Sequence, residues 1–297
     1  MVEFVLDESK SELIISNPKR SKRPKLTHGE KKPNPFAKGS ESLTPPTVFA
    51  LPNAKNWRVR CFRNAFPALK PEKAFKGIPG VGFGFHEVIV ETPSETELFQ
   101  DYDARQALLV FKAWKNRYAE LLKKKGVKSV LLFKNHGKLA GASIPHEHSQ
   151  IIAFPFIPPL LNREYFNFDW FKGNKKDFYE ELVKKHSVVS NKSFALVVSE
   201  NARFPNEFWV VCKKKKANLK ELSDSEGLDL VKLLQFGVTR LWPFTQDYIF
   251  AFHQREEKDF RLHVEVYPRN NVWAGVEYGS GVIIRSSSPQ QTRKLFT

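Results

Sequence analysis

His146-Glu147-His148-Ser149-Gln150 opens an apolar stretch that ends at Phe154, a pattern typical of a buried β-strand. Alternate strand residues point the same way, about 6.7 Å apart, so His146, His148 and Gln150 are expected on one face. Three nitrogen-bearing side chains on one surface predict a chemical site. One alternative is a structural role, with hydrogen-bonded histidines on a sheet surface. The other is a zinc site, for which two histidines are an incomplete ligand set.

His148 is the predicted nucleophile of this site, with His146 as its catalytic neighbour. A histidine is largely neutral near pH 7, and a hydrogen bond to one ring nitrogen decides which nitrogen keeps its lone pair. Gln150 can donate to phosphoryl oxygens but cannot activate water or protonate a leaving group. A phosphorylated intermediate on His148 is therefore expected to wait for a phosphate or sugar phosphate acceptor.

The chain around this stretch contains the same strand-helix-strand order twice. The first set comprises expected strands over 83–90, 130–133 and 146–154 and a helix over 103–125. The second set comprises strands over 208–211, 248–252 and 262–267 and a helix over 228–242. An offset of about 117 to 120 positions relates the sets and aligns Glu265 with His148.

We interpret this pattern as an internal duplication, the alternative being two unrelated strand-helix-strand units. The predicted fold class is α+β, with two similar halves that share a mixed sheet flanked by helices. The predicted segments are a basic, partly irregular leader (1–45), a first half with the active site (46–160), a connection (161–190) and a second half (191–297).

The formal charge of +16, from 48 Lys and Arg against 32 Asp and Glu, favours anionic partners. Nucleic acid, acidic membranes and phosphorylated metabolites all qualify. The chain has neither Cys/His finger spacing nor a Gly-rich phosphate loop before a helix, so nucleic acid is not the expected partner. Part of the positive charge clusters between Lys19 and Lys32, where a solvated tail is expected.

Only two cysteines occur, Cys61 and Cys212, so neither a disulfide framework nor a four-cysteine metal site is expected. No run approaches the roughly 18 apolar residues of a spanning helix. Acidic residues stand near Met1 where a signal peptide would be basic and then apolar. The expected location is the cytoplasm, with no membrane partner.

Two segments, Phe133 to Gly137 and Gly141 to Gln150, resemble the active-site signature of galactose-1-phosphate uridylyltransferases, within the histidine-triad superfamily. Other segments add to this resemblance: Thr44 to Pro46, Trp57 to Arg60, Asn64 to Leu69, His86 to Pro93, Leu262 to Arg269 and Gly275 to Gly279. Together they extend over about residues 34 to 285, most of the chain.

The resemblance implies a role in galactose and carbohydrate metabolism. His148 would attack the α-phosphorus of a nucleoside diphosphate sugar, become a nucleotidyl-histidine and release a hexose 1-phosphate, after which a second hexose 1-phosphate takes the nucleotide. The implied binding residues are Gln150, Asn135 and Ser143 for the phosphates, Asn64 and Phe66 beside the base, and Glu277 for the sugar. The implied fold has two histidine-triad-like halves, usually in a homodimer.

The resemblance also implies that no cofactor is required. Many members of the family hold zinc with a Cys-x-x-Cys where this chain has Asn34-Pro35-Phe36-Ala37, and a histidine near Ser94-Glu95 is missing too. Only His146 matches a ligand, so this N-terminal zinc site is predicted to be lost. A second metal site is partly matched by Glu164, His253 and His263, and its occupancy is left open.

Two other functions stay open. A nucleotide-sugar or dinucleotide phosphorylase would use the same covalent step with inorganic phosphate as acceptor, and residue types do not separate it from a uridylyltransferase. A non-catalytic nucleotide or nucleic-acid binding protein would use the basic leader instead.

Overall fold

The computed structural model describes residues 2–22, 33–71, 75–174, 176–270 and 272–297. The chain splits into two compact units, each made of segments that are separate in sequence. Unit 1 comprises residues 1–97, 112–132 and 146–167, and unit 2 comprises residues 98–111, 133–145 and 168–297. The predicted second half thus lies wholly in unit 2, whereas the predicted first half lies mainly in unit 1.

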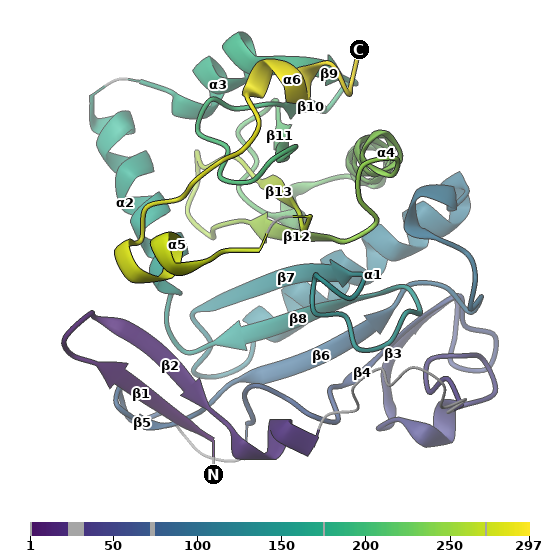
Figure 1. Cartoon of the computed structure of the whole chain (residues 1–297). Coiled ribbons are helices and arrows are strands. Elements are labelled where there is room, and N and C mark those ends of the chain that lie inside the picture. The colour runs from purple at the N-terminus through teal and green to yellow at the C-terminus, as the bar shows by residue number, and fades with distance from the viewer. Residues whose placement is uncertain (1, 23–32, 72–74, 175, 271) are drawn as a thin grey trace. The chain divides into compact units, whose positions relative to one another are not determined.

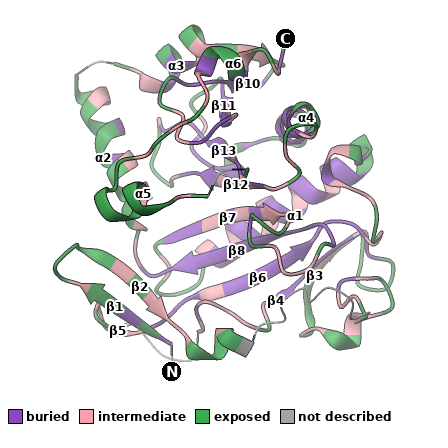
Figure 2. Cartoon of the chain, in the orientation of Figure 1, coloured by how far each residue is buried: buried purple, intermediate pink, exposed green. Residues whose placement is uncertain are grey.

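Unit 1 contains an antiparallel sheet with the order β3-β4-β6-β8, and the first residues of β7 follow β8. Its strands are β3 (Thr47–Leu51), β4 (Val59–Arg63), β6 (Phe85–Val90), β7 (Ser129–His136) and β8 (His148–Phe154). All seven residues of β8 are buried, as Figure 2 shows, which agrees with the apolar run that predicted this strand. The helix α1 (Ala104–Leu122) contributes the buried Trp114 and Tyr118 to this unit.

A second, three-stranded sheet in unit 1 has the order β2-β1-β5. It comprises β1 (Glu3–Asp7), β2 (Glu12–Ser16) and β5 (Gly80–Val81), and the hairpin of β1 and β2 is purple in Figure 1. This hairpin lies in the expected leader and was not predicted. Most of the leader's basic cluster, at residues 23–32, lies outside the described residues. Two short 3-10 helices, η1 (Pro18–Lys22) and η2 (Glu41–Leu43), complete the described part of the leader.

Unit 2 contains the sheet order β12-β13-β11-β10-β9, and the last residues of β7 pair with β12. Its strands are β9 (Ser187–Ser190), β10 (Phe194–Val197), β11 (Phe208–Cys212), β12 (Tyr248–His253) and β13 (His263–Pro268). Its helices are η3 (Phe99–Asp101), α3 (Phe178–His186), η4 (Leu219–Glu221), α4 (Asp224–Leu241), α5 (Gly275–Ser280) and α6 (Pro289–Arg293), while α2 (Pro159–Gly173) is divided between the units.

The duplication explains the strand order. In unit 1, β8 lies between β6 and β7, and in unit 2, β13 lies between β11 and β12. The long helices α1 and α4 occupy the same place in the chain order, α1 between β6 and β7 and α4 between β11 and β12. The α+β class with two similar, helix-flanked halves is therefore confirmed.

The expectation of a mixed sheet requires a correction. Every pair of named strands with a defined register in the described part of the chain is antiparallel. The physical reason is visible in unit 2, where β11 and β12 run in the same direction but β13 separates them. The crossover through α4 therefore does not create a parallel neighbour.

Both cysteines are buried free thiols. Burial raises the pKa of the Cys61 and Cys212 thiols, so both stay protonated and unreactive near neutral pH. Within the described ranges, none of the helices combines the length and the apolar character that a membrane crossing requires.

Candidate active site

The nucleophile predicted from the sequence begins strand β8 in unit 1. His148 pairs with Val90 of β6, and Gln150 pairs with Val88 of the same strand. His146, His148 and Gln150 are all buried, with exposed fractions of 2%, 5% and 5%.

The opposite face of the two strands contacts α1, as the alternation predicts. Ser149 Oγ accepts a hydrogen bond from Trp114 Nε1 at 2.7 Å. Arg117 on the same helix makes a buried, bidentate ion pair with Glu87 of β6, with N–O distances of 2.8 and 2.9 Å. These contacts fix β6 and β8 on the side opposite His148, so the face that carries His148 has a rigid support.

The tautomer of His148 follows from one backbone contact. Its Nδ1 lies 2.7 Å from the carbonyl oxygen of His146. A carbonyl oxygen can only accept, so Nδ1 carries the proton and Nε2 keeps the lone pair. The ring of Phe36 lies edge-on to the His148 ring, with centroids 5.1 Å apart. This is the geometry that a nucleophilic imidazole requires.

The orientation of Gln150 is set by His86, a residue that the sequence analysis did not assign to the site. The backbone N–H of Ala68 donates to His86 Nδ1 at 2.9 Å, so the ring proton is on Nε2. His86 Nε2 lies 3.1 Å from Gln150 Oε1 and donates to it. The Gln150 oxygen is thereby occupied, and its NH₂ group is the end left to donate to a phosphoryl oxygen.

Asn64 supports the same orientation. Its Oδ1 accepts from the backbone N–H of Phe66 at 2.8 Å, which assigns the NH₂ group to the other end of the amide. Asn64 Nδ2 then donates to Gln150 Oε1 at 3.4 Å. Asn64 Nδ2 also lies 3.2 Å from His86 Nε2, so the three side chains form one polar cluster. In the sequence, His86 is marked only as the first residue of the segment His86 to Pro93, one of those that carry the family resemblance.

His146 lies beside the nucleophile, and both of its ring nitrogens have partners. Nε2 lies 2.7 Å from the carbonyl oxygen of Thr92, and Nδ1 lies 3.0 Å from Asn34 Nδ2. Asn34 stands in the segment where many members of the resembled family have zinc-binding cysteines. The structure therefore places a hydrogen-bonded amide, not a thiolate, against His146.

A cavity of about 390 Å³ opens in unit 1 beside the residues that contact Gln150. Asn64 and His86 line it together with the cationic residues Arg63 and Lys70, which suit an anionic ligand. The remaining wall is mainly apolar, formed by Pro45, Pro46, Ala65, Pro67, Leu69, Pro71 and Phe85, with Glu87 at one edge. Concave sites with apolar walls and a few polar groups are typical of ligand pockets.

Unit 1 thus brings together His146, His148, Gln150, Asn64 and Phe66 of the predicted site. The other predicted residues lie elsewhere: Asn135 on β7, Ser143 in the loop after it, and Glu277 on α5 all belong to unit 2. Glu164 of α2 belongs to unit 1, whereas His253 and His263 belong to unit 2. The roles of these residues, including the second metal site, stay predictions.

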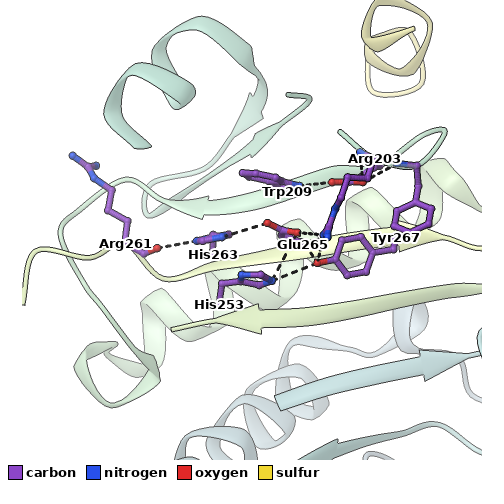
Figure 3. Close-up of polar contacts among 9 residues, drawn as sticks. Arg203, Trp209, His253, Arg261, His263, Glu265 and Tyr267 are labelled. Carbon is purple, nitrogen blue, oxygen red and sulfur yellow. Dashed lines mark hydrogen bonds and ion pairs between the residues drawn. The ribbon is translucent and has the colours of Figure 1, made fainter. Parts of the chain in front are cut away.

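Unit 2 carries a different polar cluster at the position that the duplication aligns with His148 (Figure 3). Glu265 Oε2 accepts from Arg203 Nη2 at 2.8 Å and from the Tyr267 hydroxyl at 2.5 Å. The rings of His253 and His263 stack with centroids 4.8 Å apart, and each has Nε2 within 3.8 Å of a Glu265 oxygen.

The charge of Glu265 is stabilised by these neighbours. Burial raises the pKa of its carboxyl, but His253, His263 and Arg203 outweigh burial and lower the pKa to about 2. At the position that the sequence offset aligns with His148, unit 2 thus has an ion-paired carboxylate instead of an imidazole.

Sequence comparisons with known proteins identify relatives of this chain. The model of the N-terminal domain of galactose-1-phosphate uridyl transferases matches residues 80–158. An ADP-glucose phosphorylase of Arabidopsis thaliana is 28% identical over 95% of this chain and 88% of its own length. A galactose-1-phosphate uridylyltransferase of Thermotoga maritima is 27% identical over 86% of this chain and 89% of its own length.

Solved structures of similar proteins have the same fold. The crystal structure of an ADP-glucose phosphorylase from Arabidopsis thaliana with bound ADP-glucose superimposes with a TM-score of 0.83 and 27% identity, over 100% of this chain and 98% of that chain. A galactose-1-phosphate-uridylyltransferase-like protein from the same plant superimposes with a TM-score of 0.82 and 26% identity, over 92% and 93% of the chains.

Proposed function

We propose that this chain, a divergent member of the galactose-1-phosphate uridylyltransferase family and an enzyme of the nucleotidyltransferase class, acts through a nucleotidyl-histidine at His148. It transfers a nucleoside monophosphate from a uridine diphosphate sugar to a hexose 1-phosphate. The partners are small molecules, and the protein works in the cytoplasm as a homodimer without nucleic acid or membrane.

In the first step, His148 Nε2 attacks the α-phosphorus and forms a P–N bond. The bond between this phosphorus and the bridging oxygen breaks, and the hexose 1-phosphate leaves with the electron pair. The His148 Nδ1–H stays on the His146 carbonyl, 2.7 Å away, which stabilises the positive charge that develops on the ring. In the second step, a phosphate oxygen of another hexose 1-phosphate attacks the same phosphorus and frees the histidine.

The observation that carries this proposal is the joint orientation of His148 and Gln150 on one strand face. Backbone contacts leave a lone pair on His148 Nε2, while His86 occupies the Gln150 oxygen and leaves its NH₂ group to donate. Nucleotidyl transfer needs a nucleophile and a hydrogen-bond donor to the phosphate oxygens, and both lie on the same strand face. A glutamine also provides no proton transfer to water, so the intermediate survives until an acceptor arrives.

The intermediate is tested by intact-mass measurement after mixing with UDP-glucose or ADP-glucose in the absence of acceptor. We expect one nucleoside monophosphate on the wild-type chain and none on His148→Ala, which keeps the fold because His148 only begins a strand. The control variant is His186→Ala, a histidine of α3 in unit 2, which should keep the adduct. An adduct that persists in His148→Ala would contradict the proposed nucleophile.

The second candidate function is a nucleotide-sugar phosphorylase that uses inorganic phosphate as the acceptor. It is favoured by the ADP-glucose phosphorylase relative, whose similarity extends over 95% of this chain. The two candidates share the first step and differ only in the second. Incubation of labelled UDP-glucose or ADP-glucose with either galactose 1-phosphate or inorganic phosphate separates them. Product that forms only with inorganic phosphate identifies a phosphorylase.

A further inference from the structure

We propose that Asn34 is a positioning residue that replaces a metal ion beside the nucleophile. The Asn34 amide group, itself oriented by Glu95, holds the His146 ring in one tautomer. It thereby maintains the hydrogen bond between the His146 backbone carbonyl and His148 Nδ1. This inference rests on the proposed function of His148, because it concerns the same site.

The direction of each hydrogen bond in this cluster follows from its partners. Asn34 Oδ1 accepts from the backbone N–H of Phe36 at 3.0 Å, so Nδ2 is the NH₂ end of the amide. Nδ2 lies 3.0 Å from Glu95 Oε2, a carboxylate oxygen that can only accept, and 3.0 Å from His146 Nδ1. Each of the two amide hydrogens therefore has its own acceptor.

The same geometry assigns the tautomer of His146. Because Nδ1 accepts from Asn34, the ring proton is on Nε2, which donates to the Thr92 carbonyl at 2.7 Å. The ring is thus held at both nitrogens, and it is 2% exposed. A histidine whose second nitrogen is fixed by a specific partner has a defined orientation.

His146 connects Asn34 to the proposed nucleophile, His148. The His146 backbone carbonyl accepts the Nδ1 proton of His148 at 2.7 Å. The ring of Phe36, two residues after Asn34, contacts both imidazoles, with centroids 6.2 Å from His146 and 5.1 Å from His148. Asn34 therefore supports both the polar and the apolar contacts that orient His148.

The residues around His146 do not fit a zinc ion. Zinc in proteins is bound by thiolate sulfur, imidazole nitrogen and carboxylate oxygen, usually four ligands together. Here an amide NH₂ group points at His146 Nδ1, where an ion would need the lone pair. Across the described ranges of the chain, no group of three His, Cys, Asp or Glu suited to a metal contains His146.

The first test compares Asn34→Asp with the wild-type protein. The isosteric carboxylate fills the same space but cannot donate to Glu95 or His146, and it places a second negative charge beside the Glu95 carboxylate. We expect the rate of nucleotidyl-histidine formation in a single turnover to fall about 10- to 100-fold, the usual effect of losing such a supporting partner. The KM for the sugar nucleotide should stay within about threefold, because Asn34 orients the nucleophile and not the substrate.

Two controls belong to this test. Asn53→Ala removes an exposed asparagine of a turn in the same unit and should leave the rate unchanged. Incubation of the wild-type protein with a chelator should leave the ¹⁵N chemical shifts of the His146 ring unchanged as well. An unaltered rate in Asn34→Asp, or His146 ring shifts that change with chelator and return with Zn²⁺, would overturn the proposal.

A second measurement needs neither a variant nor turnover. The ¹⁵N chemical shifts of the His146 ring in the wild-type protein should show Nε2 protonated and Nδ1 as a hydrogen-bond acceptor. A proton or a metal on Nδ1 would reject the role of Asn34, whatever the outcome for catalysis. If His146 has the expected tautomer but no nucleotide adduct forms, the proposed function fails while the hydrogen-bond arrangement stands.

Discussion

Backbone groups orient the polar side chains around His148. The His146 carbonyl accepts from His148, the Ala68 N–H donates to His86, and the Phe66 N–H donates to Asn64. A backbone group has a fixed donor or acceptor sense, so each contact selects one tautomer or one amide orientation. The site is therefore preorganised, with little reorientation left for the reaction itself.

At this scale we predict that His86→Phe lowers kcat without abolishing the fold. The phenyl ring keeps most of the volume, but Gln150 loses its strongest orienting donor and its amide can rotate. A misdirected donor at the reacting phosphate is expected to cost about 10- to 100-fold in kcat. Steady-state kinetics with the sugar nucleotide provide the measurement, with His186→Phe as the control. An unchanged kcat would mean that Gln150 is oriented by something else.

The helix α4 shows how an element is fitted to its surroundings. Ser223 caps its first turn, and Glu226 completes the capping box, so the helix begins at a defined residue. Two glycines inside the helix, Gly227 and Gly237, are buried. A Cβ on Gly227 would lie 2.2 Å from the ring of Phe111, and a Cβ on Gly237 would lie 2.4 Å from the ring of Phe208. The glycines let these aromatic rings approach the helix backbone.

We predict that Gly227→Ala destabilises the protein, although alanine is the better helix former by about 1 kcal/mol. Phe111 is fully buried and cannot move away from the new methyl group without strain. Overpacking of this kind costs about 1–3 kcal/mol in the free energy of unfolding, which denaturant titration measures. The control is Gly173→Ala at the end of α2, where a Cβ has no neighbour within 4 Å. Increased stability of Gly227→Ala would refute the close approach.

At the scale of the whole chain, two units with the same strand order carry different chemistry. Unit 1 has the proposed nucleophile, the His148 imidazole, on β8, whereas unit 2 has Glu265 at the aligned position of β13, paired with Arg203 and Tyr267. Buried ion pairs and hydrogen bonds can hold one specific arrangement of a core. Duplication has therefore produced one half that carries the proposed nucleophile and one half with a buried polar network.

We predict that each chain accepts a single nucleoside monophosphate. A carboxylate held by an arginine and a tyrosine cannot replace an imidazole as the attacking group, because its charge is already neutralised by its partners. Intact mass after exhaustive incubation with sugar nucleotide, followed by peptide mapping, measures this ratio. A second adduct, on any residue of 191–297, would show that the second half is also reactive.

The sequence alone was sufficient for the features that depend on local spacing. The two-residue period on β8 predicted which side chains share a face with His148, and the contact of Ser149 with Trp114 on the other face agrees with it. Helical spacing located α1 and α4, and the repeated order predicted the duplication. These inferences were possible because side-chain direction in a helix or strand follows from position within that element.

Only the tertiary structure decided which distant segments meet. His86 is 64 positions from Gln150, and Asn34 is 112 positions from His146, yet each pair shares a hydrogen bond. The antiparallel neighbours of β8 and β13, and the hairpin of β1 and β2, also depend on which strands become adjacent. Strand order and register are set by packing across the whole fold, so no local period in the sequence encodes these partners.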